Sequence, residues 1–590
     1  MYEEKLASSS KSDPKKLHGY IRNKKASRPS VGPLKIGNEL TDDPKRMAEA
    51  LVTSFSNVFD DTPPPATIPH QHCESSLTQC IPQAERVKLH LSRLKNGSSP
   101  GPDGVSSTFL KRFAAELATP LTQIFTQSLE ASVVPVQFKT ARVSAIFKGK
   151  GTRSDPSNYR PISLTSIPGK LLEKTVFECL MKYFNENSIL IDNQFGFRNK
   201  RSTVDQLLHT YETITKWYDE DEVVDVVLFD YSKAFDRPNH NLIIDKHKHL
   251  GIDDPLLGWL LSFLVDRIMF VSIGGSSSSY KGVSSGVPQG SVLGPLLFLI
   301  FVNHLTHNLH CKHAFFADDL KIFLTTSSRD NVATLQEDID SLARISADWG
   351  LQFNVDKSVN LRFQRSSTPN TDSIFTLNGS PISCEPFHKD LGVIIDSSLR
   401  FHNQAISAAS KAGGVALNLF KGTTCRTRKF MLTLLISHMR PILEYGSQVW
   451  NTGYSGDLIL LESVQRRWTK RIDGLEDLSY EHRLRELDLF SVKGRFWRSD
   501  MIYCWKLLHG LTPLSPDHFF TRAPNVGTRG HSFKLFVPQA SIEARKRSFS
   551  HRVVPDWNSL PSPVVEATSL NEFKGRLASA CRDKLFDFID

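Results

Sequence analysis

The chain of 590 residues is too long for one hydrophobic core, so we expect two to four domains. Hydrophobic residues make up 40% of it and charged residues 23%, which is typical of globular proteins and excludes a disordered chain. The net charge is +10, and most of it lies from Phe401 onward, where 27 Lys and Arg face 18 Asp and Glu. A basic C-terminal third suits a nucleic-acid partner, although a solvated basic surface would have the same composition.

Cysteine usage and hydropathy indicate a soluble, intracellular protein. The eight cysteines form no C-x-x-C motif, which argues against a disulfide framework and for a reducing compartment. The one cluster that could bind zinc, formed by His70, His72, Cys73 and Cys80, has no common zinc-site spacing. No apolar run approaches the roughly 18 residues of a membrane helix, and no signal peptide occurs, so we expect no membrane contact.

Residues 1–97 are predicted to be a charged, partly helical lead-in that ends in a proline-rich linker. Apolar residues recur at helical spacing over 44–59, and proline and polar residues dominate 61–82. A turn rich in glycine and proline at 98–104 then precedes an amphipathic helix over 107–117. We place the first domain boundary at this turn.

A basic hairpin is predicted next. The segment Arg142–Lys148 alternates like a strand and leads into a loop of Gly and Lys, and a second strand over Asn158–Leu164 carries Arg160. Cations on such a hairpin can bind phosphate groups. An exposed basic hairpin without a ligand is the alternative that these residues leave open.

A buried strand ends at a carboxylate further along the chain. The β-branched run Val223–Phe229 predicts a strand covered on both faces, and Asp230 follows where it stops. Ligand-binding groups of open sheets gather at such strand ends. Asp236, in the next loop or helix, is better explained as a helix cap or an ion-paired residue.

A glycine-rich loop over Gly282–Pro295 leads into a hydrophobic helix at 296–305. Gln289 and Gly290 lie shortly before the helix begins. Glycine lets the backbone approach a ligand closely, so this loop is a candidate binding element.

Two adjacent carboxylates, Asp318 and Asp319, interrupt the apolar run His313–Leu324, which predicts a hairpin with both at its tip. An ionised carboxylate in apolar surroundings needs a cation. The same dipeptide also occurs in three polar, loop-like settings, at 42–43, 60–61 and 253–254. Solvated turns explain those three pairs, so context singles out the hairpin as a candidate metal site.

The remaining chain continues with a helix over 332–349 and strands at 361–363 and 388–395, and it becomes helical and basic beyond residue 400. Two basic stretches, 465–471 and 493–498, contain tryptophan. Cations beside aromatic rings suit contacts to a nucleic-acid backbone with base stacking. Buried tryptophans beneath surface cations explain the pattern equally well.

Asp230, Asp318 and Asp319 can converge if the strand and the hairpin share one sheet. Three hard oxygen ligands suit Mg²⁺, which binds carboxylates together with substrate phosphates. Two such ions roughly 3.5–4 Å apart can activate a hydroxyl and stabilise the leaving oxygen of a phosphoryl transfer. The sequence therefore predicts a two-metal centre for nucleotidyl transfer.

Eight short segments follow one another in a recognisable order: Phe147–Lys148, Asn158–Leu164, Gln194–Arg198, Phe229–Asp236, Gly286–Ser291, Phe316–Asp319, Asn354–Lys357 and Leu391–Gly392. Together they resemble the reverse transcriptases of non-LTR (LINE-type) retrotransposons, especially jockey-like ones. The resemblance implies an RNA-directed DNA polymerase that extends a DNA primer on an RNA template with deoxynucleoside triphosphates.

The resemblance also implies an α+β, right-hand polymerase fold. Fingers and palm, with an antiparallel sheet, would span 98–395, with a core of about 128–395, and a helical, basic thumb and connector would occupy 396–590. A nuclear location is implied as well. The chain carries no signal for its oligomeric state.

By the same resemblance, Asp230, Asp318 and Asp319 would hold two Mg²⁺ ions, for which Mn²⁺ could substitute. Phe235, five residues after Asp230, would be the bulky residue that excludes a 2′-hydroxyl. That hydroxyl is what separates ribonucleotides from deoxynucleotides.

Five further residues receive roles from the resemblance. Arg160 and Lys148 would contact the triphosphate. Gln289 and Gly290 would line the pocket for nucleotide and template. Lys357 would donate a proton to the leaving pyrophosphate.

The chain departs from these elements in several ways. Pro238 stands where an apolar residue other than proline is usual, and Ser358 stands where threonine is usual. No endonuclease domain precedes the polymerase region and no zinc-knuckle cysteines occur, so we expect a truncated copy or a partial gene model. Two alternative functions are an RNA-dependent RNA polymerase, against which Phe235 argues, and a catalytically silent nucleic-acid-binding remnant, against which the three aspartates argue.

Overall fold

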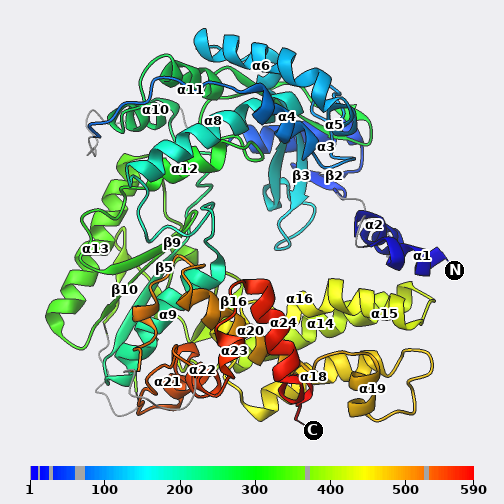
Figure 1. Ribbon diagram of the computed structural model, residues 1–590. Coiled ribbons are helices and arrows are strands. Elements are labelled where there is room, and N and C mark those ends of the chain that lie inside the picture. The colour runs from blue at the N-terminus through cyan, green and yellow to red at the C-terminus, as the bar shows by residue number, and fades with distance from the viewer. Residues whose placement is uncertain are drawn as a thin grey trace.

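The computed structural model of the protein describes residues 2–10, 14–24, 31–59, 73–365, 373–523 and 531–589. Two five-stranded sheets with helices packed beside them form the framework, and a helical region follows towards the C-terminus (Figure 1). The predicted α+β fold is confirmed. Among the described residues, no helix is both long enough and apolar enough to cross a membrane.

The sheet that carries the candidate site is antiparallel except at its β14 edge. Its strands, in spatial order, are β14 (Ser383–Cys384), β11 (Val359–Phe363), β5 (Val224–Phe229), β10 (Asp319–Thr325) and β9 (Lys312–Phe316). Along β5, Val227 and Phe229 pack into one hydrophobic core, whereas Val224, Val226 and Leu228 pack into another. The predicted strand with both faces covered is therefore confirmed.

The second sheet contains the basic hairpin. Its strands are β4 (Tyr159–Leu164), β3 (Thr140–Phe147), β6 (Arg267–Ile273), β7 (Ser276–Ser277) and β8 (Lys281–Val283), of which β6 pairs with both of the last two. The helix α3 (Pro44–Ser56) comes from the predicted lead-in and covers this sheet, with Leu51 and Phe55 in one core with Val143 and Val271. Directly before α3 in the sequence, the short strands β1 (Leu34–Ile36) and β2 (Glu39–Thr41) form a hairpin. The strands predicted at 142–148 and 158–164 are confirmed.

Helices surround the largest hydrophobic core, which packs against one face of the β5 sheet. They are α4 (Ala84–Ser92), α5 (Ser107–Arg112), α6 (Ala114–Glu130), α7 (Val136–Lys139), α8 (Ile167–Glu186), α10 (His240–His249), α11 (Leu256–Leu264), α12 (Gly294–Val302) and α13 (Arg329–Asp348). The single helix predicted over 107–117 is wrong, because a break at Phe113 separates α5 from α6. α12 is buried on almost every side, as its unbroken apolar sequence requires.

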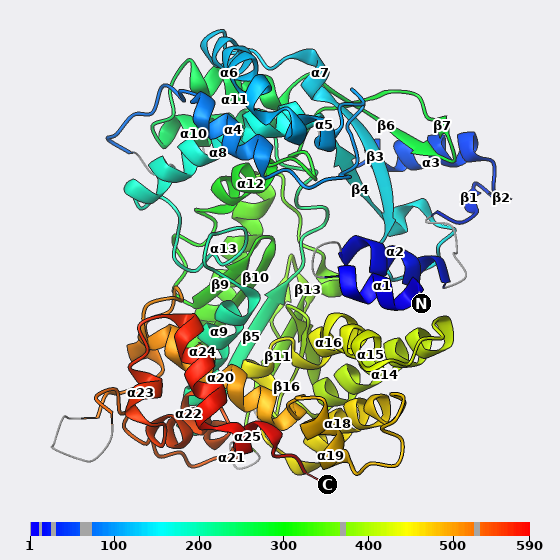
Figure 2. The ribbon, with the colours of Figure 1, turned by 45° about the vertical axis from the view of Figure 1, so that its right-hand side comes forward.

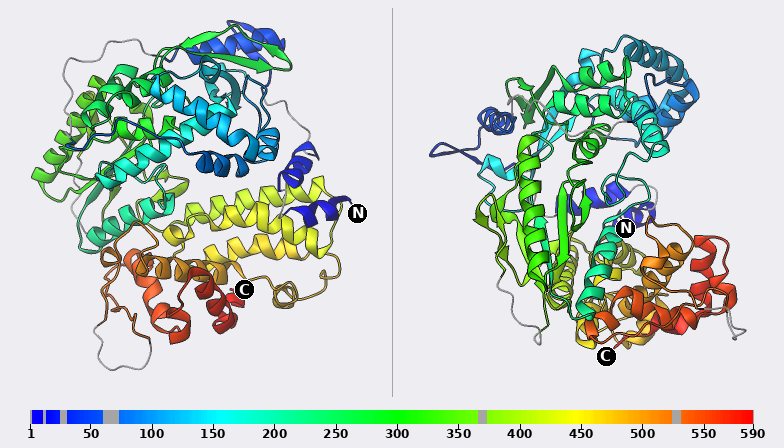
Figure 3. Two further views of the ribbon diagram at one scale, coloured as in Figure 1. Left: turned by 45° about the horizontal axis from the view of Figure 1, so that its top comes forward. Right: turned by 90° about the vertical axis from the view of Figure 1, so that its left-hand side faces the viewer.

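The C-terminal helices pack into two cores, one of which they share with the other face of the β5 sheet through α9 (Thr203–Asp219). They are α14 (His402–Gly422), α15 (Arg428–Leu434), α16 (Arg440–Glu444), α17 (Ser447–Trp450), α18 (Ser455–Thr469), α19 (Tyr480–Glu486), α20 (Val492–Leu508), α21 (Glu543–Lys546), α22 (Phe549–Asn558), α23 (Ser562–Val565), α24 (Leu570–Ala580) and α25 (Arg582–Phe586). Figure 3 shows these helices, in yellow to red, packed beneath the green and cyan elements. The core thus crosses residue 395, and the division into domains at 97 and 395 stays a prediction.

The strand expected over 388–395 is wrong in detail. The chain forms a hairpin there, of β15 (Phe387–Asp390) and β16 (Val393–Asp396). Its turn, Leu391 and Gly392, has positive φ values of 43° and 92°. A glycine inside an apparent strand was the available turn signal, because glycine readily takes a positive φ.

Two N-terminal helices dock on the C-terminal region and not on the sheet that α3 covers. α1 (Tyr2–Ser9) and α2 (Pro14–Lys24) bury Leu6 and Leu17 in one core with the helices α14 and α15. The Glu3 carboxylate accepts hydrogen bonds from the backbone N–H groups of Thr424, at 3.1 Å, and Cys425, at 2.7 Å. Figure 2 shows α1 and α2 between the β3–β4 hairpin and α14–α16.

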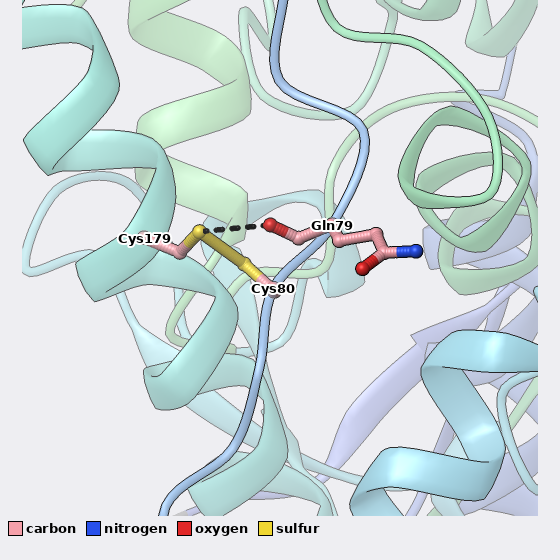
Figure 4. Close-up of a disulfide and its surroundings, with 3 residues drawn as sticks. All are labelled: Gln79, Cys80 and Cys179. Atoms are coloured by element: carbon pink, nitrogen blue, oxygen red, sulfur yellow. Dashed lines mark hydrogen bonds between the residues drawn. A yellow bond between two sulfur atoms is a disulfide. The ribbon is translucent and has the colours of Figure 1, made fainter.

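A disulfide joins Cys80 to Cys179 on α8, beside the carbonyl of Gln79 (Figure 4). It ties the segment before α4 to the large core across 99 residues of sequence. The bond differs from the expectation that the cysteines are reduced. It also removes Cys80 from the zinc cluster considered above, whose His70 and His72 lie outside the described residues.

We predict that Leu17→Ala weakens the packing of the C-terminal helices. The Leu17 side chain is 1% exposed, and truncating a buried leucine costs about 2–4 kcal/mol because it leaves a cavity. Hydrogen exchange of the amides in α14 and α15 measures this loss. Lys15→Ala, at an exposed position of the same helix, is the control and should change the exchange little. Equal exchange in both variants would contradict the docking of α2.

Candidate active site

The hairpin predicted around the adjacent aspartates is confirmed. β9 and β10 are antiparallel neighbours, and Asp318 lies in the turn between them. β10 also pairs with β5, in a register that sets Leu320 opposite Phe229. Asp319 at the start of β10 therefore lies beside Asp230, which directly follows β5. The three predicted carboxylates thus lie together where these strands meet the turn.

The carboxylates at this edge are electrostatically strained. Burial, together with the nearby charges of Asp318, Asp390 and Asp230, raises the pKa of Asp319 to about 7 against the lowering effect of Lys321. Burial and the charge of Asp230 also raise the pKa of Asp318, against the opposing effect of Arg160. A set of carboxylates that resist ionisation in one another's presence gains stability from a bound cation.

Asp230 has a cationic partner. Its Oδ2 atom accepts a hydrogen bond from Nζ of Lys357 at 3.1 Å, and both side chains are partly exposed. In the described part of the chain, no three His, Cys, Asp or Glu side chains form a group that could hold a metal ion as placed. The donor set itself, three carboxylates at one sheet edge, has the chemistry that Mg²⁺ and Mn²⁺ prefer.

A cavity of about 560 Å³ opens beside the carboxylates. Seven of the nine residues singled out from the sequence line it, namely Lys148, Arg160, Asp230, Phe235, Gln289, Asp318 and Lys357. Asp319 and Gly290 lie outside its lining. The helix α3, which received no catalytic role in the predictions, supplies part of the wall through Ser54 and Phe55, and Val58 just beyond its end contributes as well.

Cations gather on one side of the cavity. Burial lowers the pKa of Lys148, and the positive charges of Lys233, Arg160 and Lys357 lower it further. Lys233, which the sequence analysis did not single out, lies three residues after Asp230 and also lines the cavity. The four side chains repel one another, and a bound polyanion such as a triphosphate would relieve this repulsion.

Phe235 forms a firm part of the cavity wall. Its ring stacks on Phe298 of α12, with ring centroids 4.3 Å apart, and meets the edge of Phe197 at 6.1 Å. Because α12 is buried, the Phe235 ring has a rigid support on the side away from the cavity.

The side chains of Asp236 and Gln289 are paired. Nε2 of Gln289 donates a hydrogen bond to Oδ1 of Asp236 at 2.8 Å. Burial raises the pKa of Asp236 to about 6, although this hydrogen bond and two nearby lysines lower it. The interpretation of Asp236 as a helix cap or ion-paired residue is therefore wrong, because its partner is an amide in the glycine-rich loop.

Backbone contacts hold the glycine-rich loop between the two sheets. The N–H of Val287 donates to the Phe235 carbonyl, and the N–H of Ser163 on β4 donates to the Gln289 carbonyl, each at 2.8 Å. Gly290 has a φ of 110°, and a Cβ atom there would lie 2.6 Å from the Ser163 carbonyl oxygen. Glycine is required at this position for both reasons.

The segment Gln194–Arg198, quoted above for the resemblance, has a structural role that the sequence did not reveal. The buried Gln194 carboxamide accepts hydrogen bonds from the N–H of Ala317, at 3.0 Å, and of Gly196, at 2.8 Å. Its Nε2 donates to the Ala317 carbonyl at 3.3 Å. A glutamine among apolar residues was the available signal, since a buried amide needs partners.

The tryptophans of the two basic stretches belong to the interior. Trp468 is 1% exposed, and its indole N–H donates to the Met431 carbonyl at 3.0 Å. Phe496 is equally buried, and Trp497 packs against two of the hydrophobic cores. Base stacking by Trp468 is excluded, so the alternative of a buried ring beneath surface cations is correct for that stretch, whereas Trp497 is half-buried.

Residues 148–385 match the family described as "Reverse transcriptase (RNA-dependent DNA polymerase)". The matched span includes the hairpin, the end of β5 and the glycine-rich loop.

Curated transposon polymerases are similar to a longer part of the chain. The chain is 29% identical over 458 residues to "Probable RNA-directed DNA polymerase from transposon BS" of Drosophila melanogaster, which covers 74% of this chain and 50% of the relative. It is 28% identical over 424 residues to "RNA-directed DNA polymerase from mobile element jockey" of the same species, covering 68% and 46%. The chain thus spans about half the length of these relatives. The resemblance to jockey-like reverse transcriptases is confirmed.

A solved structure is similar at a much greater distance. Apo telomerase from Candida tropicalis, truncated from its C-terminal domain, matches 48% of this chain and 59% of its own, with 14% identity and a TM-score of 0.31. A likeness this weak carries no argument about the site.

We predict that the ion pair between Lys357 and Asp230 contributes little to stability. Lys357→Met should change the free energy of unfolding by less than about 1 kcal/mol, because the pair is exposed to solvent. Arg362→Met is the matched comparison, since Arg362 pairs at 2.9 Å with the fully buried Asp225 of the same sheet, and it should cost about 3–5 kcal/mol. Urea unfolding followed by circular dichroism measures both, and equal losses would mean that Lys357 has a structural role.

Proposed function

We propose that this chain is an RNA-directed DNA polymerase that extends a DNA primer on an RNA template with deoxynucleoside triphosphates. One observation carries the proposal: carboxylates, cations and a rigid aromatic ring line a single cavity within the reverse transcriptase domain. The names of the BS and jockey relatives support it. The resemblance to these elements extends the proposal to a nuclear location.

In this proposal, Asp230, Asp318 and Asp319 hold two Mg²⁺ ions, with Mn²⁺ as a substitute. When bound, such ions activate the 3′-hydroxyl of the primer and stabilise charge on the leaving group. The raised pKa values of Asp318 and Asp319 support this assignment, because a cation would relieve their repulsion. Lys357, once released from Asp230, would donate a proton to the leaving pyrophosphate, and its position in the cavity lining supports this role.

The cations of the cavity would bind the triphosphate. Arg160, Lys148 and Lys233 offer charge-assisted hydrogen bonds to phosphate oxygens. Gln289 and Gly290 would line the pocket for nucleotide and template. The backbone bonds that hold their loop against β4 support this role, since they keep the loop at a fixed distance from Arg160 on the same strand.

Primer extension on an RNA template, with Mg²⁺ and either deoxy- or ribonucleotides, tests the proposal. We predict that Asp318→Ala lowers extension by at least roughly 100- to 1000-fold, because it removes a charged group at the reacting centre, while circular dichroism stays unchanged. Asp42→Ala, at an exposed position in another Asp-Asp pair, is the matched control and should retain full activity. Extension by Asp318→Ala at the wild-type rate would refute the assignment of the site.

We predict that Phe235→Ala admits ribonucleotides. Removing the ring that stacks on Phe298 opens space at the cavity wall, and steric exclusion of this size is worth roughly 10- to 200-fold in selectivity. The ratio of kcat/KM for deoxy- and ribonucleotides measures it. Phe113→Ala, on the surface between α5 and α6, is the control. An unchanged ratio in Phe235→Ala would remove Phe235 from the proposed selection step.

The same assay separates the alternatives. Preference for ribonucleotides by the wild-type chain would support an RNA-dependent RNA polymerase. Binding of the RNA–DNA hybrid without incorporation, by a folded chain, would support a silent nucleic-acid-binding remnant.

A further inference from the structure

The turn that presents Asp318 has an unusual backbone. Ala317 lies in the left-handed region, with a φ of 58°, although it carries a Cβ atom. Such a conformation costs roughly 1 kcal/mol or more in a residue other than glycine, asparagine or aspartate, and it persists only where the surroundings hold it. The strands of the hairpin do not stabilise this conformation by themselves, because Ala317 lies outside the backbone pairing of β9 with β10.

The side chain of Gln194 supplies it from outside the hairpin. Its Oε1 accepts the N–H of Ala317 at 3.0 Å, and its Nε2 donates to the carbonyl of the same residue at 3.3 Å. The Gln194 carboxamide thus forms hydrogen bonds with both the N–H and the carbonyl group of Ala317. Gln194 is 2% exposed, so no water competes for these bonds.

The backbone around Gln194 is itself attached to β9. The N–H of Phe195 donates to the Phe315 carbonyl at 3.0 Å, and the N–H of Phe315 donates to the Asn193 carbonyl at 2.8 Å. A Cβ atom on Gly196 would lie 2.2 Å from the Ala317 nitrogen. The segment therefore packs against the turn without room for a side chain, and Gln194 cannot move away independently of the hairpin.

We propose that Gln194 is a positioning residue for metal binding: its carboxamide fixes the Ala317 turn, and through it the direction of the Asp318 carboxylate. The inference rests on the proposed function, in which Asp318 is a metal ligand. Residues that orient metal ligands without touching the metal commonly change metal affinity by roughly 10- to 100-fold when they are replaced.

The test compares metal binding in full-length variants. Gln194→Met keeps the volume of the side chain and removes its bonds to Ala317. Mn²⁺ binding, followed by electron paramagnetic resonance of the free ion, should weaken by roughly 10- to 100-fold in this variant. The Mg²⁺ concentration for half-maximal primer extension should rise by a similar factor.

A matched control separates positioning from general loss of packing. Gln465 is fully buried among the C-terminal helices, where its Nε2 donates to the Tyr480 hydroxyl and the Phe490 carbonyl. Gln465→Met should lower stability and leave Mn²⁺ affinity unchanged. Gln194→Glu, which keeps the acceptor for both N–H groups and loses only the donor, should fall between wild type and Gln194→Met.

The outcomes are distinct. Unchanged Mn²⁺ affinity in folded Gln194→Met and Gln194→Glu would overturn the inference, as would equal weakening in Gln465→Met. If the wild-type chain binds Mn²⁺ and loses that affinity in the Gln194 variants but extends no primer, the proposed polymerase function fails while the positioning role stands.

Discussion

Mutual repulsion among carboxylates is the constraint on which the rest of this structure depends. Asp230, Asp318 and Asp319 would move apart if their backbones could yield, and two of them already resist ionisation. The backbones do not yield, because β5 is packed into a hydrophobic core on each face and β10 is paired on both edges. A sheet strand buried in this way moves only with the cores around it.

The fold divides the remaining tasks of the site among elements that are distant in sequence. The basic hairpin supplies positive charge, α12 supports an aromatic wall, and the glycine-rich loop connects the two sheets. Each element owes its position to apolar packing or backbone bonding elsewhere, so the polar side chains themselves contribute little to stability. The site is therefore free to hold charges that a folded protein would otherwise avoid.

Local patterns were enough to find the elements and the carboxylates. The alternation around Asp318 predicts the hairpin, and the β-branched run before Asp230 predicts the strand, because both signals lie within a few residues. Partners across long distances were not predictable. Asp236 meets Gln289 over 53 residues, Gln194 meets Ala317 over 123, and Cys80 meets Cys179 over 99. The pattern around Trp468 fits a surface as well as a core, and only the packing of α18 decides between them.

The placement of α3 bears on what counts as the unit of function. This helix lies outside residues 148–385, yet it forms part of the cavity wall and covers the apolar face of β3 and β6. A shortened protein cut to residues 148–385 would lack both α3 and β3, and it would expose Met269 and Val271 of β6 to water. It would combine all three carboxylates of the proposed site with an exposed apolar surface and a pocket that lacks one wall. The span of sequence similarity is therefore shorter than the stretch of chain that packs together around the cavity.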